Sequence, residues 1–448
     1  MSRLVLVAAV LAIAADARAG GMFLPVRGVR ALSQGGALIA GSDDADSLWL
    51  NPAGLAHLAG RGHYELLVDA AYVYQAVDYA RIDSGGNQLA KISNQSKGLP
   101  VPTIAGAVAL GDRLVLGGGI AAPYAGLHKY DPDGPQRYAS VSLEGSLFVY
   151  LTAGAAYKVT DRLRVGVTVM DVYSKVASQI VLSGCPGQTV CAPEDPDFDA
   201  FGQDTQTDVW SASGSLGVQY DALDNATLGL AVQAPMKVSA TGTFMSRLPS
   251  SAFFQGAEVV GSASDLALTL PATIHGGVEV RPIPSVRVEA ALDVELWKEQ
   301  KSITIQPHGV QIENAAGVGT YVVGDLTIPR HYKNSYAPAI GAEWHRRTLV
   351  LGAGYSYETA AAPKGYVSVL TVDSAKHVVG LGGGYSAGGW QIGGALGLVM
   401  LADVHVSLAE AKVNQLTPIR DQPSTVPVNA GSYQSHYLLA GLRFARQF

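Results

Sequence analysis

Three carboxylates lie within four positions, at Asp43, Asp44 and Asp46, and they are the first residues of the sequence that could bind a metal ion. A calcium-binding EF-hand loop supplies oxygen ligands at fixed spacing and ends on a bidentate glutamate, and neither feature follows these acids. The ten histidines are scattered, without a pair that would share one strand face. We therefore expect no metal site, and we expect the three acids to face solvent or an internal lumen.

Two cysteines stand close together, Cys185 and Cys191, in a segment rich in Pro, Gly and Asp. In an exported protein, such a pair in a loop is typical of a local disulfide. Metal binding would need more ligands than two thiolates, and the only nearby candidates are Asp and Glu. The spacing therefore predicts a Cys185–Cys191 disulfide, and we expect it on the extracellular side.

No arrangement of nucleophile and base stands out. Ser435 and His436 are adjacent, and adjacent side chains of a strand point to opposite faces, so these two cannot pair directly. Glycine-rich stretches such as Gly352–Gly354 and Gly380–Gly382 lack the following helix that would bind a phosphate. The sequence indicates neither an enzyme nor a bound cofactor.

The first 19 residues predict a signal peptide. Arg3 precedes an apolar stretch that is too short for a membrane-spanning helix, which needs about 20 residues, and Ala17–Ala19 has the small-x-small pattern of a cleavage site. Removal of this segment takes two arginines and one aspartate, so 29 basic residues remain against 36 acidic ones and the net charge changes from -6 to -7. An acidic chain argues against nucleic acid as a partner.

The whole chain is unusually apolar, with a mean hydropathy of +0.19 over its 448 residues. Only 15% of its residues are charged, against about 25% in soluble domains. No apolar run is long enough for a transmembrane helix, and 52 glycines argue against a helical protein. The apolar residues instead recur at alternate positions, which favours strands embedded in lipid.

The alternation is clearest from Val286 to Trp297. One phase of this segment is wholly apolar, and the other carries Arg287, Glu289, Asp293 and Glu295. Successive side chains of a strand point to opposite faces, so one face is expected to meet lipid and the other a polar lumen. Similar segments, each about ten residues long, are long enough to cross the hydrocarbon when tilted. A soluble β-sandwich would give the same period, so alternation alone leaves both open.

The lengths of the connections separate these two classes. Six short turns, near 111–113, 160–162, 221–226, 282–284, 346–347 and 388–389, alternate with seven long polar connections, near 80–100, 124–145, 183–206, 245–264, 300–332, 361–373 and 409–431. This alternation gives fourteen strands. Short periplasmic turns and long extracellular loops are typical of outer-membrane β-barrels. The last strand ends on the aromatic Phe448, which resembles the assembly signal of such barrels.

Residues 20–60 do not alternate and are expected to form an N-terminal hatch before a barrel of residues 61–448. They contain a Gly/Ala-rich stretch, the acidic residues Asp43 and Asp44, and then Asn51, Pro52 and Ala53. This arrangement resembles the outer-membrane long-chain fatty acid transporter (FadL) family, which includes toluene and xylene uptake channels. Further similarities lie at 102–124, 137–138 and 268–297. The two cysteines match no motif of the family.

The resemblance implies a hatch that fills the barrel lumen, a substrate groove among the extracellular loops, and a pocket beside the hatch. It also implies a kink in the third strand that opens a lateral window into the membrane. The third strand of this chain contains Gly117, Gly118 and Gly119, and interior glycines often mark bulges. These glycines are therefore predicted to form the kink; the alternative is that they relieve crowding against the hatch.

The sequence thus predicts a passive transporter for hydrophobic small molecules in the outer membrane of a Gram-negative cell. Long-chain fatty acids are the first expectation and aromatic hydrocarbons the second. The expected partners are outer-membrane lipid, lipopolysaccharide and the barrel assembly machinery, and the barrel is expected to be a monomer. A general porin should lack a plug of this size. An outer-membrane enzyme and a surface receptor or adhesin remain as alternatives of other classes.

Overall fold

The structure is a computed structural model that describes residues 28–448 except 61, 188, 317–318 and 420–422. The predicted signal peptide and the first part of the predicted hatch lie outside these residues. Within the described part, no helix is long and apolar enough to cross a membrane.

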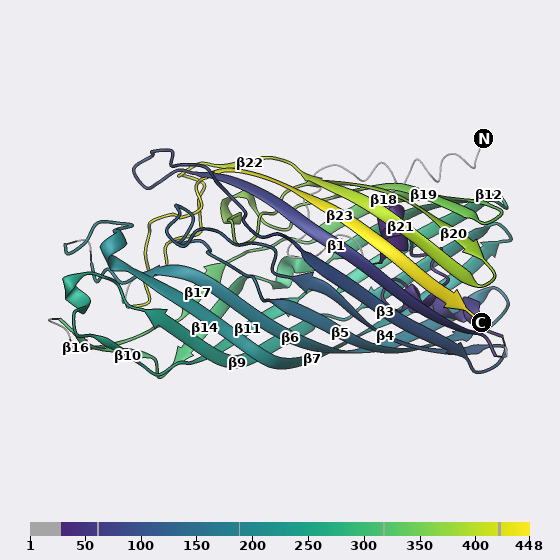
Figure 1. Ribbon diagram of the computed structural model, residues 1–448, viewed down its shortest axis with the longest axis horizontal. Helices are drawn as coiled ribbons and strands as arrows, with labels where there is room; N and C mark the ends of the chain where they lie inside the picture. Colours follow the sequence, from purple (N-terminus) through teal and green to yellow (C-terminus); the bar gives the residue numbers. More distant parts are fainter. Residues whose placement is uncertain (1–27, 61, 188, 317–318, 420–422) are drawn as a thin grey trace.

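Fourteen antiparallel strands form a closed barrel, as the sequence predicts (Figure 1). Each strand pairs with the next in chain order, and the last pairs with the first. The barrel strands are β1 (Tyr64–Arg81), β3 (Leu99–Ala109), β4 (Leu114–Ala125), β5 (Leu147–Lys158), β6 (Leu163–Ser183), β7 (Asp199–Leu223), β8 (Ala226–Gln233), β12 (Thr273–Ile283), β13 (Val286–Glu295), β18 (Ser335–Arg346), β19 (Leu349–Glu358), β20 (Lys376–Ala387), β21 (Trp390–Leu401) and β23 (Gly431–Gln447).

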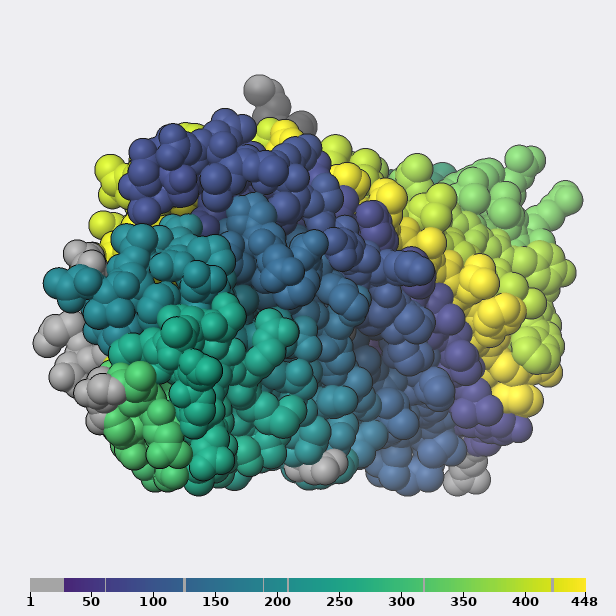
Figure 2. Space-filling model, turned by 60° about the vertical axis from the view of Figure 1, so that its left-hand side comes forward, coloured from purple at the N-terminus to yellow at the C-terminus, as the bar shows by residue number. Residues whose placement is uncertain are grey.

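The six short turns are confirmed at one end of the barrel, where two to four residues connect successive strands. The C-terminus lies at this end, on the right in Figure 1, and we take it as the periplasmic end. Long connections meet at the other end, where segments from several parts of the chain cover the surface (Figure 2). Short pieces here are β2 (Ile92–Ser93), β22 (Val404–Val406), η3 (Pro196–Phe198), η4 (Ala252–Phe254), η5 (Trp297–Glu299) and η6 (Lys364–Tyr366).

The long connections contain more strands than the sequence indicates. β9 (Met236–Arg247) and β11 (Ala263–Leu270) continue β8 and β12 after breaks at Pro235 and Pro271, and each pairs with the other. β14 (Ser302–His308) and β17 (Leu326–Pro329) extend this sheet, although 300–332 was expected to be a loop. β10 (Glu258–Val260), β15 (Gln311–Ala315) and β16 (Gly319–Val322) form a separate small sheet. The wall thus rises beyond the membrane on one side.

The hatch fills the periplasmic half of the lumen. It contains the short helix α2 (Val29–Ser33) and two 3-10 turns, η1 (Ala45–Leu48) and η2 (Pro52–Leu58). Contacts with β4 to β7 hold η2, and contacts with β19 to β23 hold α2, so the segment lies across the inside of the barrel. Nearly all of its described residues are buried. The predicted plug within the lumen is confirmed.

Candidate functional site

Ion pairs join the hatch to the barrel wall. Arg30 of α2 binds Glu343 of β18 through two hydrogen bonds, with nitrogen–oxygen distances of 2.7 and 2.8 Å, and also contacts Asp43 and Asp44. Arg443 of β23 binds Asp44 at 2.8 Å. The acids expected to face solvent or the lumen therefore face the lumen, where they neutralise buried arginines. Such pairs are costly to break, because removal of one partner leaves the other as an uncompensated buried charge.

A carboxylate of the wall also holds the hatch by its backbone. Glu289 of β13 accepts hydrogen bonds from the amides of Ile39, Ala40 and Gly41, with donor–acceptor distances of 2.6, 2.8 and 2.8 Å. Three successive N–H groups that converge on one carboxylate form an anion nest. The lumen-facing phase of β13 thus fixes the hatch, whereas Leu292 on the opposite phase is 41% exposed on the outer face.

The motif of Asn51, Pro52 and Ala53 lies at the start of η2. The side chain of Asn51 accepts from the Ala53 amide at 3.2 Å and donates to the carbonyl oxygens of Ile39 and Val218. Asn51 therefore caps η2 and ties it both to the hatch loop and to β7. The motif thus positions the hatch.

The three glycines of β4, which are predicted to form the kink, lie in a regular part of the ladder, and the lateral window stays a prediction. Gly117, Gly118 and Gly119 pair in continuous register with both neighbouring strands. A Cβ atom on Gly119 would lie 2.5 Å from the carbonyl oxygen of Ile104 on β3 and 2.7 Å from the ring of Trp49, and one on Gly117 would lie 3.1 Å from a hatch leucine. These two glycines make room for the hatch, which is the alternative considered for the sequence.

The irregularity of the third strand lies a few residues further on. The register between β4 and β5 shifts between Ala121 and Tyr124, and pairing between β3 and β4 ends at Ala121. Three prolines, Pro100, Pro102 and Pro123, flank the unpaired stretch. Proline has no backbone N–H to donate, so these residues explain why the ladder ends here.

A cavity lies beside the hatch and against this unpaired stretch. Its wall includes Val73 of β1, Pro123 of β4 and Tyr150 of β5, and its floor includes Leu32 and Trp49 of the hatch. It holds about 730 Å³ of space not filled by atoms, part of it open to solvent. The indole N–H of Trp49 donates to Thr152 at 2.9 Å, which fixes the ring at the floor. The cavity lies next to the irregular strand, and its lining also includes the acidic residues Asp46 and Asp69.

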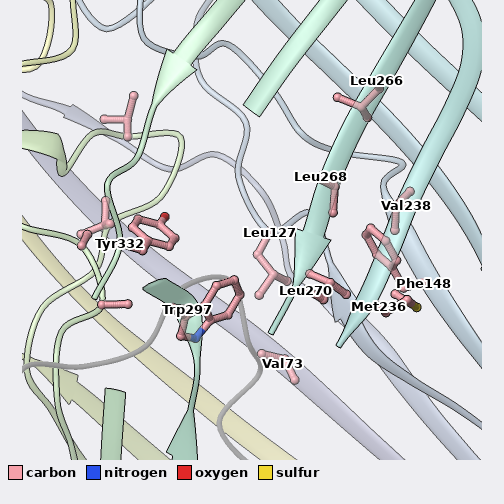
Figure 3. Packing of buried hydrophobic residues seen from close by; sticks show 14 of the residues in the cluster. Val73, Leu127, Phe148, Met236, Val238, Leu266, Leu268, Leu270, Trp297 and Tyr332 are labelled. Atoms are coloured by element: carbon pink, nitrogen blue, oxygen red, sulfur yellow. The ribbon is translucent and has the colours of Figure 1, made fainter. Parts of the chain in front are cut away.

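A second cavity lies towards the extracellular end and is almost wholly apolar. It holds about 950 Å³ of space not filled by atoms, part of it open to solvent. Its lining includes Phe148, Leu266, Leu268, Ile303, Ile305 and Ile328. A layer of buried apolar side chains from distant parts of the chain packs in one cluster with Val73 of the first cavity and Phe148 of the second (Figure 3). This layer contains Leu127, Met236, Val238, Leu270, Trp297 and Tyr332.

One arginine lines this apolar cavity. Arg330, which follows β17, is 1% exposed, and its Nε and Nη2 atoms have no hydrogen-bond partner among the described residues. Its guanidinium carbon lies 5.8 Å from the ring centre of Tyr332. Burial and the nearby charge of Arg330 lower the pKa of His128 to about 3, so this imidazole is neutral at physiological pH. Asp204 also lines the cavity, but its carboxylate accepts from Ser264 and Gln206.

The two cysteines are joined by a disulfide in the loop between β6 and β7, at the end with the long connections. Both are buried, and Glu194 follows them with a positive φ of 61°. Its carboxylate accepts from the fully buried Arg81 at 2.7 Å. The loop therefore contributes to the packing of the extracellular end. Among the described residues, no group of three or more His, Cys, Asp or Glu is placed to hold a metal ion.

Comparisons with known proteins agree with this architecture. The family described as outer membrane protein transport protein (OMPP1/FadL/TodX) matches residues 10–436. The chain belongs to this family. A FadL homologue of Pseudomonas aeruginosa shares 17% identity over 95% of this chain and 99% of its own, with a TM-score of 0.75. The toluene transporter TodX of Pseudomonas putida shares 17% identity over 95% of this chain and 99% of its own, with a TM-score of 0.66. A search of curated proteins finds no match.

Membership of the FadL family places the chain in the outer membrane as a transporter of hydrophobic substrates. The structures most similar to it include a FadL homologue and toluene transporters, so the family covers more than one substrate class.

The sequence had not indicated Arg330, because nothing local distinguishes a buried arginine from an exposed one. The signal that could have located the strand irregularity was the group of prolines rather than the glycines.

Proposed function

We propose that this FadL-family barrel takes up long-chain fatty acids by passive diffusion. The observation that carries the proposal is Arg330, whose Nε and Nη2 groups have no hydrogen-bond partner among the described residues at the wall of a largely apolar cavity. A buried charge without a partner is strongly unfavourable. A monocarboxylate with a long apolar tail would neutralise the guanidinium and fill the cavity with the same molecule. An uncharged aromatic hydrocarbon would fill the cavity but would not neutralise the guanidinium.

The proposed route continues towards the membrane. From the Arg330 cavity the tail would follow the apolar layer to the cavity beside Trp49. There it meets the unpaired stretch between β3 and β4, which supports lateral exit between these strands near Pro123. We also propose that the barrel acts as a monomer, in contact with lipid and lipopolysaccharide through its apolar outer face, after insertion by the barrel assembly machinery.

The decisive experiment compares two substrates in one variant. Arg330→Met should weaken binding of oleate, because a hydrogen bond to a charged group contributes about 1.5–3 kcal/mol, or roughly 10- to 150-fold in affinity. Uptake of toluene should stay at the parental level. The measurements are oleate binding to the purified protein, and growth or uptake with either substrate in a deletion strain complemented with each variant.

The variant is expected to fold, since it replaces an unpaired buried charge with an apolar side chain of similar length. Arg247→Met is the matched control, because it removes an exposed arginine of β9 outside the cavity. Unchanged oleate affinity in Arg330→Met would contradict the fatty acid assignment. Uptake of toluene but not oleate by the parent would favour an aromatic hydrocarbon channel instead.

A further inference from the structure

The short strand β17 separates the Arg330 cavity from a groove on the extracellular surface. Thr327 and Pro329 line the groove, whereas Ile328 and Arg330 line the cavity. This is the alternation expected of a strand with different surroundings on its two faces. The groove holds about 1030 Å³ of space not filled by atoms, part of it open to solvent. One four-residue strand therefore forms the partition between outside and inside.

β17 is held firmly on only one side. It pairs with β14 along one edge, where Thr304 and Thr327 face each other with their hydroxyl oxygens 3.2 Å apart. Its other edge faces the segment 412–418. Within the described part of the chain, one backbone hydrogen bond crosses this seam, from the Gly324 amide to the Pro418 carbonyl at 2.9 Å. An edge with so few bonds can open at little cost in hydrogen bonding.

Two leucines close the seam. Leu326 of β17 and Leu416 of the segment 412–418 line both the groove and the cavity, so they lie where the two spaces meet. Leu326 is 2% exposed, and Leu416 is partly buried. Apolar side chains at this place would seal the cavity against water and still offer no polar barrier to a hydrocarbon tail.

The groove also contains an unsatisfied polar group. Gln415 is 4% exposed, and its side-chain Nε2 has no hydrogen-bond partner among the described residues. A buried amide donor costs free energy unless it is bonded, and a carboxylate passing through the groove would accept from it. The groove thus contains a buried donor without a hydrogen-bond partner, as does the cavity behind it, where Nε and Nη2 of Arg330 have no acceptor among the described residues.

We propose that the ligand enters through the seam between β17 and residues 412–418, with the groove as its first binding site and β17 as a flap that opens at Leu326 and Leu416. The proposal deepens the proposed function and rests on it for the identity of the ligand. The acid head group would bond first to Gln415 and then to Arg330, and the tail would follow between the leucines. The flap would then return to its position against the segment 412–418.

A disulfide across the seam tests the flap. The backbones of Gly324 and Pro418 already meet, and a Cβ atom on Gly324 would have only the Pro418 carbonyl oxygen near it, at 3.3 Å. The double variant Gly324→Cys with Pro418→Cys can therefore be cross-linked by oxidation. In the control variant, Ala267→Cys with Thr304→Cys, the cross-link joins β11 to β14 and leaves the seam free.

The readout is stopped-flow binding of two probes to purified protein, a fluorescent fatty acid and the uncharged dye N-phenyl-1-naphthylamine. Oxidation of the seam variant should slow association and dissociation of both probes at least tenfold without a change in Kd, and a reducing agent should restore the rates. The control variant should keep the parental rates in both redox states, and Gln415→Met should slow association of the acid alone.

Association of both probes at the parental rate in the oxidised seam variant would overturn the proposal. This outcome is distinct from a failure of the proposed function, which would show as an unchanged fatty acid Kd in Arg330→Met. The uncharged dye tests the seam even if the ligand is not an acid, because opening of the flap does not depend on the head group.

Discussion

Removal of the Glu289 carboxylate should loosen the hatch without disturbing the barrel. In Glu289→Ala, the amides of Ile39, Ala40 and Gly41 lose their common acceptor. An unsatisfied buried amide costs about 1–3 kcal/mol. We use the lower end of this range, about 1 kcal/mol per amide, because water can enter the space left by the side chain. The sum of about 3 kcal/mol corresponds to a factor of roughly 100 in the opening equilibrium of the hatch loop.

Hydrogen exchange measures this opening directly. Mass spectrometry of the peptide that covers residues 36–43 should show these three amides protected in the parent and exchanging about 100-fold faster in Glu289→Ala. Glu289→Gln should give an intermediate rate. Its amide oxygen can still accept from two of the donors, while its NH₂ group faces the third N–H and cannot accept from it.

Asp293→Asn is the matched control. Asp293 lies on the same strand and the same phase, but its carboxylate binds His275 of the neighbouring strand and not the hatch. The control should therefore exchange like the parent at residues 36–43. If Glu289→Ala also exchanged at the parental rate, the carboxylate would not be the anchor and the hatch would be held by its ion pairs alone.

Two further predictions concern the wall. Leu292→Arg places a charge on the lipid face near the middle of β13 and should cost roughly 2–4 kcal/mol, measured as a loss of folded protein in lipid vesicles; folding at the parental yield would reverse the assigned phase. Gly119→Val should destabilise the protein by about 1–3 kcal/mol through overpacking against the hatch. Gly118→Val should not destabilise the protein, because a Cβ atom at this position would meet only one atom, at 3.4 Å. Equal melting temperatures of Gly118→Val and Gly119→Val would contradict this expected difference.

Local pattern was enough to predict the barrel. The alternation from Val286 to Trp297 depends only on the two-residue period of a strand, and the structure places Arg287 and Glu289 against the hatch, as that period requires. The short turns were found for the same reason, since Gly, Pro and Asp mark them in the sequence. Both features are properties of neighbouring residues.

The strands beyond the membrane could not be found in this way. β14 and β17 do alternate between apolar and polar side chains, but they are only seven and four residues long, too short to stand out within a long polar connection. Their existence depends on pairing: β14 pairs with β11, which lies more than 30 residues earlier in the chain, and β17 pairs in turn with β14. The polar connection at 300–332 therefore resembled a loop.

The glycines of β4 illustrate a different limit. A glycine in a strand indicates either a bend or a close neighbour, and the sequence alone does not identify the neighbour. At Gly119 the neighbours are the backbone of Ile104 on β3 and the ring of Trp49, which lies 70 positions earlier. The bend belongs to Pro123, where the effect is local because proline lacks a donor wherever it stands.

The distribution of charge inside the barrel gives a physical reason for the proposed sideways route. Around the hatch, ion pairs such as Arg30–Glu343 and Arg443–Asp44 occupy the periplasmic half of the lumen. An apolar molecule that moved straight on would have to separate these pairs or displace the water around them, and either step is unfavourable. The cavity beside Trp49 borders this charged layer, since Asp46 and Asp69 are part of its lining, and it also borders the unpaired edge of β4. Lipid lies beyond that edge, so sideways exit is the direction in which an apolar tail stays in apolar surroundings.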